Sequence, residues 1–203
     1  MSTAEFQANI TTVRRGRRLE YLTIIWNSLE GLIAISAGVV VGSIALVGFG
    51  FDSVIEVSSG AIILWRLASG EHREKLALQL VGVSFLALAV YVAFDAAKSF
   101  WFRETPEASY VGIGIAALSL IVMPVLARAK RGVASNLKSR AMHADSRQTD
   151  ICAYLSAILL GGLLLNAAFG WWWADPAAAL VMVPIIVKEG IEGLRGETCD
   201  DCC

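Results

Sequence analysis

The fold of this chain is decided by the stretch GSIALVGFGFDSVIE, residues 42–56. The stretch is largely apolar, yet it carries two carboxylates, Asp52 and Glu56. Because they are four residues apart, they share one face of a helix, one turn from each other. The next strong cation along the chain is Arg66, ~15 Å further along a helix. Two acids on one face of a membrane helix are costly, so we expect them to point into the protein, where an exchangeable cation can balance them.

The composition is that of an integral membrane protein. Of the 203 residues, 56% are hydrophobic, and the mean hydropathy is +0.62. Soluble domains are ~45–50% apolar, so little of this chain is left for a soluble domain. The formal net charge of −1 gives no indication of nucleic-acid binding. We expect the lipid bilayer as the environment and no nucleic-acid partner.

The apolar runs are each near the ~20 residues that span a bilayer. We expect an all-α membrane protein with six transmembrane helices, over residues 19–41, 45–67, 76–100, 110–126, 142–169 and 175–191. This divides the chain into a cytoplasmic lead (1–18), a six-helix transport domain (19–196) and a Cys-rich cytoplasmic tail (197–203).

The basic residues that flank the spans predict the orientation. Only Lys98 and Arg103 fall on one side of a six-span arrangement. The opposite side carries Arg14, Arg15, Arg17, Arg18, Arg66, Arg73, Lys75, Arg128, Lys130, Arg131, Lys138, Arg140, Lys188 and Arg195. The positive-inside rule places this side, and therefore both termini, in the cytoplasm. We expect a multi-pass protein of the bacterial inner membrane.

The fifth span begins with a polar run, HADSRQTDIC, residues 143–152. On a helix, Asp145, Gln148 and Cys152 share one face. His143 and Asp150 share another face, together with Ser146 or Arg147.

Two antiparallel helices that each carry a polar pair at similar depth can surround one ion with four side chains. Such a metal site would join Asp52 and Glu56 to a fifth-span pair four residues apart, which is either Gln148 and Cys152 or Ser146 and Asp150. Four ligands of this kind suit tetrahedral coordination. A thiolate ligand favours zinc or cadmium over magnesium or calcium. Protons compete for such ligands and offer a route to release.

Other interpretations of these residues stay open. The two acids of the second span could line a hydrated pore, and a lone Cys152 could be a packing residue. Glu30 in the first span could pair with Arg147 or form a hydrogen bond with Asn27. His143 could lie at the cytoplasmic surface.

The tail ends in Cys199, Cys202 and Cys203 beside two acids. A single Cys-x-x-Cys lacks half of a structural zinc site. The tail could chelate a soft metal ion or be an incidental reactive end.

Three motifs resemble the transmembrane part of the cation diffusion facilitator family. They are GSIAL at residues 42–46 followed by the acid pair, Ala144-Asp145 at the start of the fifth span, and WADP at 173–176. They occur in the order and spacing of that family, and the resemblance covers nearly the whole chain.

The resemblance implies a homodimer that exports divalent transition metals from the cytoplasm in exchange for protons. Without gaps, Ala144-Asp145 fixes the fifth-span ligands as Gln148 and Cys152, which departs from the family's usual His and Asp. A gapped match would instead use Ser146 and Asp150. The chain resembles the short branch of the family, which lacks the cytoplasmic C-terminal domain and includes a vesicular zinc transporter of animals.

Our main hypothesis is therefore a secondary transporter, not an enzyme, with zinc as its cargo and no cofactor. Supporting or pathway roles would fall to Glu30, His143, Asp145 and Asp150. The alternative is a membrane-embedded metal sensor or accessory subunit that binds soft metals through its Cys tail. Motifs of intramembrane enzymes are not found in the spans.

Overall fold

The computed structural model describes residues 3–69, 74–103, 106–137 and 139–195. Within these ranges the regular structure is entirely helical. The six helices are α1 (Thr3–Val41), α2 (Ile44–Ser69), α3 (Glu74–Phe102), α4 (Tyr110–Leu137), α5 (Arg140–Phe169) and α6 (Ala174–Arg195). The predicted all-α fold is confirmed.

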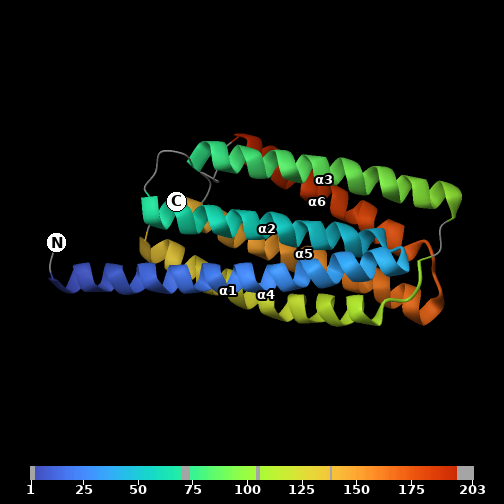
Figure 1. Cartoon of the computed structure of the whole chain (residues 1–203), viewed down its shortest axis with the longest axis horizontal. Coiled ribbons are helices and arrows are strands. Elements are labelled where there is room, and N and C mark those ends of the chain that lie inside the picture. Colours follow the sequence, from blue (N-terminus) through green and yellow to red (C-terminus); the bar gives the residue numbers. More distant parts are fainter. Residues whose placement is uncertain (1–2, 70–73, 104–105, 138, 196–203) are drawn as a thin grey trace.

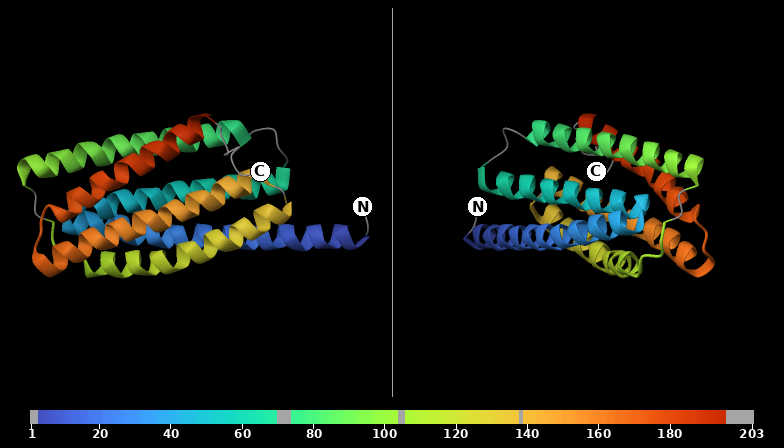
Figure 2. Two further views of the ribbon diagram at one scale, coloured as in Figure 1. Left: turned by 180° about the vertical axis from the view of Figure 1, so that it is seen from behind. Right: turned by 45° about the vertical axis from the view of Figure 1, so that its right-hand side comes forward.

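The helices form an elongated bundle in which consecutive helices run in opposite directions (Figure 1). The central pair is α2 and α5, which contact each other. On one side of this pair, α1 packs on α2 and α4 packs on α5; on the other side lie α3 and α6, packed on each other (Figures 1 and 2). The start of α1 and the end of α6 lie at the same end of the bundle.

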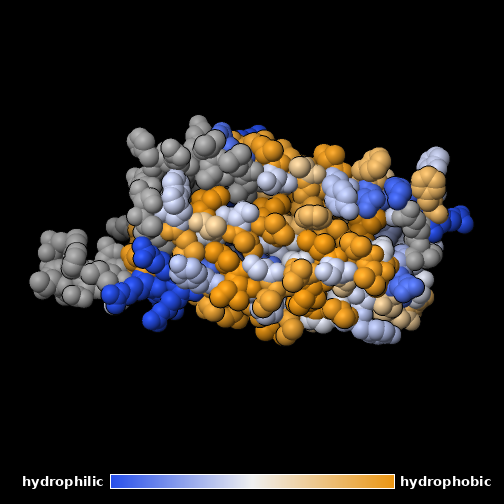
Figure 3. Space-filling model, in the orientation of Figure 1, coloured by the Kyte–Doolittle hydropathy of each residue, from blue (hydrophilic) through white to orange (hydrophobic). Residues whose placement is uncertain are grey.

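Among the described residues, five helices are long and apolar enough to cross a membrane. Their apolar segments are Thr11–Val41, Ile44–Trp65, Gly82–Phe102, Tyr110–Leu137 and Asp145–Phe169. The sixth, α6, is more polar because Lys188, Glu189 and Glu192 lie in its last turns, but it packs along α3 within the same bundle. Apolar residues cover the middle of the face seen in Figure 3, and hydrophilic residues gather toward the two ends. The multi-pass membrane architecture follows, whereas the orientation across the membrane stays a prediction.

Two helices are longer than the sequence indicated. Residues 3–18, expected to be a polar lead, continue α1 as helix. Residues 127–141, expected to lie outside the fourth and fifth spans, are largely helical, because α4 continues to Leu137 and α5 begins at Arg140. Lys130, which we had counted among the flanking charges, lies inside this helix with 0% of its surface exposed. The sequence placed the end of the fourth span too early because the last turns of α4 are polar, and polar residues ordinarily mark the membrane boundary. In the structure the buried lysine of these turns is paired with acids of α1 and α5.

Small residues allow α1 and α2 to approach closely. A Cβ atom added at Gly50 would lie 2.6 Å from Ile35 Cγ1 and 2.9 Å from the Ile35 backbone nitrogen. One added at Gly38 would lie 2.9 Å from the backbone nitrogen of Val47. Membrane helices commonly use small residues in this way, because backbone proximity maximises van der Waals contact.

The amino-terminal end of α2 is held by α6. Gly42 adopts φ +71°, a left-handed conformation that turns the chain sharply out of α1. The buried carboxylate of Asp175 then accepts hydrogen bonds from Ser43 Oγ and from the backbone nitrogens of Ile44 (2.9 Å) and Ala45 (3.4 Å). Asp175 therefore caps a helix distant in sequence, where an anion is also favoured by the helix dipole. This contact joins the GSIAL and WADP motifs and fixes the start of the helix that carries Asp52 and Glu56.

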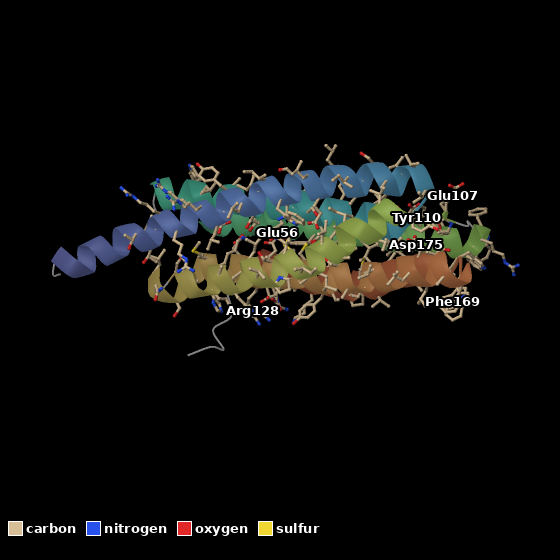
Figure 4. All side chains as sticks on the ribbon, turned by 90° about the horizontal axis from the view of Figure 1, so that it is seen from below. Glu56, Glu107, Tyr110, Arg128, Phe169 and Asp175 are labelled. Carbon is tan, nitrogen blue, oxygen red and sulfur yellow. The ribbon has the colours of Figure 1, made fainter. Side chains whose placement is uncertain are left out.

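Replacing Asp175 by Ala should lower the stability of the bundle by about 1–3 kcal/mol, because three donors at the start of α2 lose their shared acceptor. Thermal unfolding of the detergent-purified protein measures this. The exposed Glu107→Gln provides a control at the same end of the bundle (Figure 4). Equal unfolding temperatures for Asp175→Ala and the parent would contradict the capping role.

Candidate metal-transport site

The candidate site lies between the two central helices. Asp52 and Glu56 of α2 and Cys152 of α5 are all buried. The Cys152 thiol lies close enough to interact with both carboxylates. Figure 4 shows Glu56 in the interior of the bundle, well away from Asp175. The antiparallel packing of α2 and α5 thus brings together three of the four predicted ligands.

Part of the hydrogen-bonding capacity of these acids is unused. Glu56 Oε1 accepts a hydrogen bond of 2.7 Å from Thr149 Oγ1, but Glu56 Oε2 and Asp52 Oδ2 are buried without a hydrogen-bond partner. Buried polar atoms are nearly always paired, and each unpaired one costs free energy. Such oxygens are available to a cation or a proton.

Gln148, the fourth predicted ligand, is only half-buried, and its Nε2 atom is buried without a hydrogen-bond partner. Within the described ranges, no three His, Cys, Asp or Glu side chains are arranged so that they could already hold a metal ion. Asp52, Glu56 and Cys152 are therefore gathered but not in ligating positions. The four-ligand site stays a prediction that requires side-chain movement.

The gapped alternative, Ser146 and Asp150, has other contacts. Asp150 forms an ion pair with Arg131 of α4, and both side chains are partly exposed. Ser146 Oγ donates a hydrogen bond of 2.7 Å to the carbonyl oxygen of His143, itself half-buried. The geometry therefore directs Cys152 toward the acids of α2 and Asp150 toward α4.

Glu30 of α1 is a third buried acid beside α2. It accepts a hydrogen bond of 3.1 Å from Ser53 Oγ, while its Oε1 atom has no hydrogen-bond partner. Asn27 Nδ2 donates instead to the Thr23 carbonyl oxygen, at 3.0 Å. Ser53 is adjacent in sequence to Asp52, so the carboxylate of Glu30 borders the candidate site. The sequence indicated a supporting or pathway role for Glu30 but not its contact with Ser53, because the two residues are on different helices.

Asp145 is held in a network that sequence reasoning missed. Its Oδ2 atom lies 2.6 Å from Lys130 Nζ, and its Oδ1 atom accepts a hydrogen bond of 3.0 Å from Ser59 Oγ. Lys130 also lies 3.2 Å from Glu20 Oε2. Both Lys130 and Glu20 are buried, although each lies near a predicted span boundary where a charge ordinarily reaches water. Had the fourth helix been predicted to continue past Arg128, Lys130 would have been placed inside the bundle, within reach of these acids.

Acidic groups greatly outnumber basic ones in the described interior. It holds one ammonium group and six carboxyl groups: Lys130 against Glu20, Glu30, Asp52, Glu56, Asp145 and Asp175. Asp175 is stabilised as a helix cap, and Lys130 can balance one further charge. The remaining buried acids require protons or cations, because uncompensated charge in the membrane interior is costly.

The three cysteines proposed as a chelating tail, Cys199, Cys202 and Cys203, lie outside the described residues. Their role stays a prediction.

A family model described as the cation efflux transmembrane domain matches residues 21–196, which is most of the chain. The chain belongs to the cation efflux family. The predicted resemblance is thus confirmed.

Curated relatives agree with this assignment. The chain is 27% identical to Transmembrane protein 163 of Xenopus laevis over 86% of its own length and 64% of the relative's. It is 30% identical to an uncharacterized transporter of Methanocaldococcus jannaschii over 82% of its length and 63% of the relative's. A cadmium, cobalt and zinc/H⁺–K⁺ antiporter of Bacillus velezensis is 28% identical over 58% of the chain and 37% of the relative. The chain thus spans less than two thirds of the length of each of these relatives.

A thiol at the site predicts a spectroscopic signature. In a variant with Cys199, Cys202 and Cys203 all changed to Ser, Cys152 is the remaining cysteine. Cadmium should give this protein an ultraviolet thiolate-to-metal charge-transfer band, because Cd²⁺ prefers thiolate ligands. Adding Cys152→Ser should abolish the band, whereas adding Asp150→Asn should leave it. Cadmium binding to the triple-Ser protein without this band would favour the gapped alternative, because Ser146 and Asp150 supply no thiolate.

Proposed function

We propose that this protein transports a divalent transition-metal cation, with zinc as the main cargo, out of the cytoplasm. The observation that carries the proposal is the cluster of Asp52, Glu56 and Cys152, buried between the two central helices with unpaired carboxylate oxygens. Membership in the cation efflux family supports a transporter rather than an enzyme.

Ligand chemistry supports a soft or borderline metal. Two carboxylates alone would suit hard ions, but the adjacent thiol adds affinity for zinc and cadmium. The antiporter of Bacillus velezensis is named for cadmium, cobalt and zinc, which agrees with this class of cargo. Because Asp52, Glu56 and Cys152 are not in ligating positions, loading would draw their side chains together, with Gln148 as the proposed fourth ligand.

Proton exchange gives a mechanism for release. Asp52, Glu56 and Cys152 are all groups that bind protons, so protonation from the far side of the membrane would weaken the metal site. Glu30 borders the cluster through Ser53, and the Asp145 carboxylate is linked to Glu56 through Lys130 and Thr149. Both acids would carry protons or metal along the bundle. We propose a homodimer in a bacterial inner membrane as the working assembly.

Replacing Asp52 by Asn should reduce zinc uptake into inside-out vesicles by at least about a hundredfold, because one charged ligand is lost while the shape is kept. A zinc-sensitive dye inside the vesicles reports the flux. Asp150→Asn is the matched control, since Asp150 pairs with Arg131 away from the cluster. Equal uptake by the Asp52→Asn variant and the parent would refute the proposed site.

The same vesicles distinguish the transporter from the alternative of a metal sensor or accessory subunit. Deleting residues 197–203 should leave most of the zinc flux, because the proposed site lies within the helices. An accessory protein that acts through Cys199, Cys202 and Cys203 would instead lose its effect with the tail.

Proton antiport predicts that zinc entry changes the pH of the vesicle lumen. Zinc entering inside-out vesicles should drive protons out, so a lumenal pH dye should report alkalinisation. The signal should be absent in Asp52→Asn vesicles. Zinc uptake without a lumenal pH change, in vesicles with a low proton leak, would contradict proton coupling.

A further inference from the structure

Lys130 occupies a buried pocket built by four helices. Its ammonium group, carried by α4, lies 2.6 Å from Asp145 Oδ2 and 3.3 Å from Thr149 Oγ1, both on α5. On the α1 side it lies 3.2 Å from Glu20 Oε2. From α2, Ser59 Oγ donates a hydrogen bond to the other oxygen of Asp145. A positive charge is therefore enclosed by carboxylate and hydroxyl oxygens.

Glu20 is the incompletely satisfied member of this pocket. It is fully buried, and neither of its carboxylate oxygens has a hydrogen-bond partner. Its attraction to Lys130 is thus an ion pair without hydrogen-bond geometry. Gly60 of α2 lies beside it, and a Cβ atom at this position would be 3.4 Å from Glu20 Oε2. Gly60 therefore brings no side-chain group against this carboxylate.

The pocket is continuous with the candidate metal site. Thr149 Oγ1 lies 3.3 Å from Lys130 Nζ and also donates to Glu56 Oε1 at 2.7 Å. Along α1, Glu20 precedes Glu30 by ten residues, or ~15 Å of helix. The pocket therefore lies nearer the start of α1 than the cluster does, which is the side predicted to face the cytoplasm.

We propose that Glu20, Asp145, Ser59 and Thr149 form a second cation site, in which the Lys130 ammonium occupies the place of a free cation. Lys130 is then a tethered competitor: a cation that passes from the cytoplasm toward Asp52 and Glu56 displaces it. The role of the pocket in transport rests on the proposed function, whereas its capacity to bind a cation does not.

A purely structural ion pair would give different behaviour. If Lys130 only holds the helices together, a free ion cannot replace it, because the covalent attachment to α4 is what joins the helices. If the pocket is a cation site, an external ion can take the place of the ammonium. The oxygen-only lining suits a hard cation, so Mn²⁺ is the appropriate probe and also gives an electron paramagnetic resonance signal.

The experiment measures Mn²⁺ binding to purified protein in which Asp52→Asn disables the candidate metal site. Adding Lys130→Gln to this background should give about one additional bound Mn²⁺ per chain, because Glu20 and Asp145 lose their counter-ion. Adding Glu20→Gln as well restores the charge balance of the pocket and should remove the additional Mn²⁺. Bound and free Mn²⁺ are distinguished by the intensity of the resonance signal.

Arg131→Gln is the matched control. Arg131 is the next residue of α4 and pairs with Asp150 of α5, but this pair is partly exposed, with 39% and 25% of the two side chains accessible. Water can screen Asp150 after the substitution, so no additional Mn²⁺ is expected. A gain equal to that of Lys130→Gln would mean that any freed acid binds Mn²⁺, and would overturn the proposal.

Two further outcomes would also overturn it. The first is a folded Lys130→Gln protein that binds no more Mn²⁺ than its background. The second is a Lys130→Gln protein that cannot be recovered even from cells grown with added Mn²⁺, since an external cation then fails to replace the ammonium. Recovery that depends on added Mn²⁺ supports the proposal. Because binding is measured with Asp52→Asn present, a failure of zinc transport leaves this test unaffected.

Discussion

An excess of buried negative charge is the constraint on which the rest of this structure depends. Lys130 is surrounded by more acids than it can balance, and the acids of α2 lie further along the same interior. A membrane interior tolerates such an excess only where cations, protons or dipoles compensate it. A cation transporter must have this property, because a site fully neutralised by fixed protein charges would have no affinity for its cargo.

A small number of helix–helix contacts determines where the buried acids of α2 lie. The central position of α2 and α5 follows from close packing by small residues on one side, as at Gly50, and from the Asp175 cap at the start of α2. With its start anchored by α6, α2 presents Asp52 and Glu56 to α5 at a fixed depth. The distant WADP motif therefore acts on the site through the position of a helix, without contacting its acids.

The sequence predicted this architecture well because its signals are local. Hydropathy identified the spans, and the four-residue spacing of Asp52 and Glu56 correctly placed both side chains in the interior. Motif register directed attention to Cys152, which the structure brings to these acids. Contacts between helices could not be predicted: Thr149 was overlooked because a threonine carries no charge signal. Lys130 was assigned to a loop because a lysine past an apolar run ordinarily marks the membrane boundary.

The order of ligand types along the bundle offers a basis for selectivity. Around Lys130 the ligands are carboxylate and hydroxyl oxygens, whereas the cluster beyond Thr149 adds the Cys152 thiol. A cation moving from the first set to the second would exchange hard ligands for a softer one. Magnesium dehydrates reluctantly and gains little from a thiolate, so it would not bind the second set more tightly than the first. Zinc binds thiolate strongly, so the second set would favour it over the more abundant hard ions. Discrimination would then come from the transfer between the two sets, and Thr149, which contacts both Lys130 and Glu56, would be the residue that lies between them.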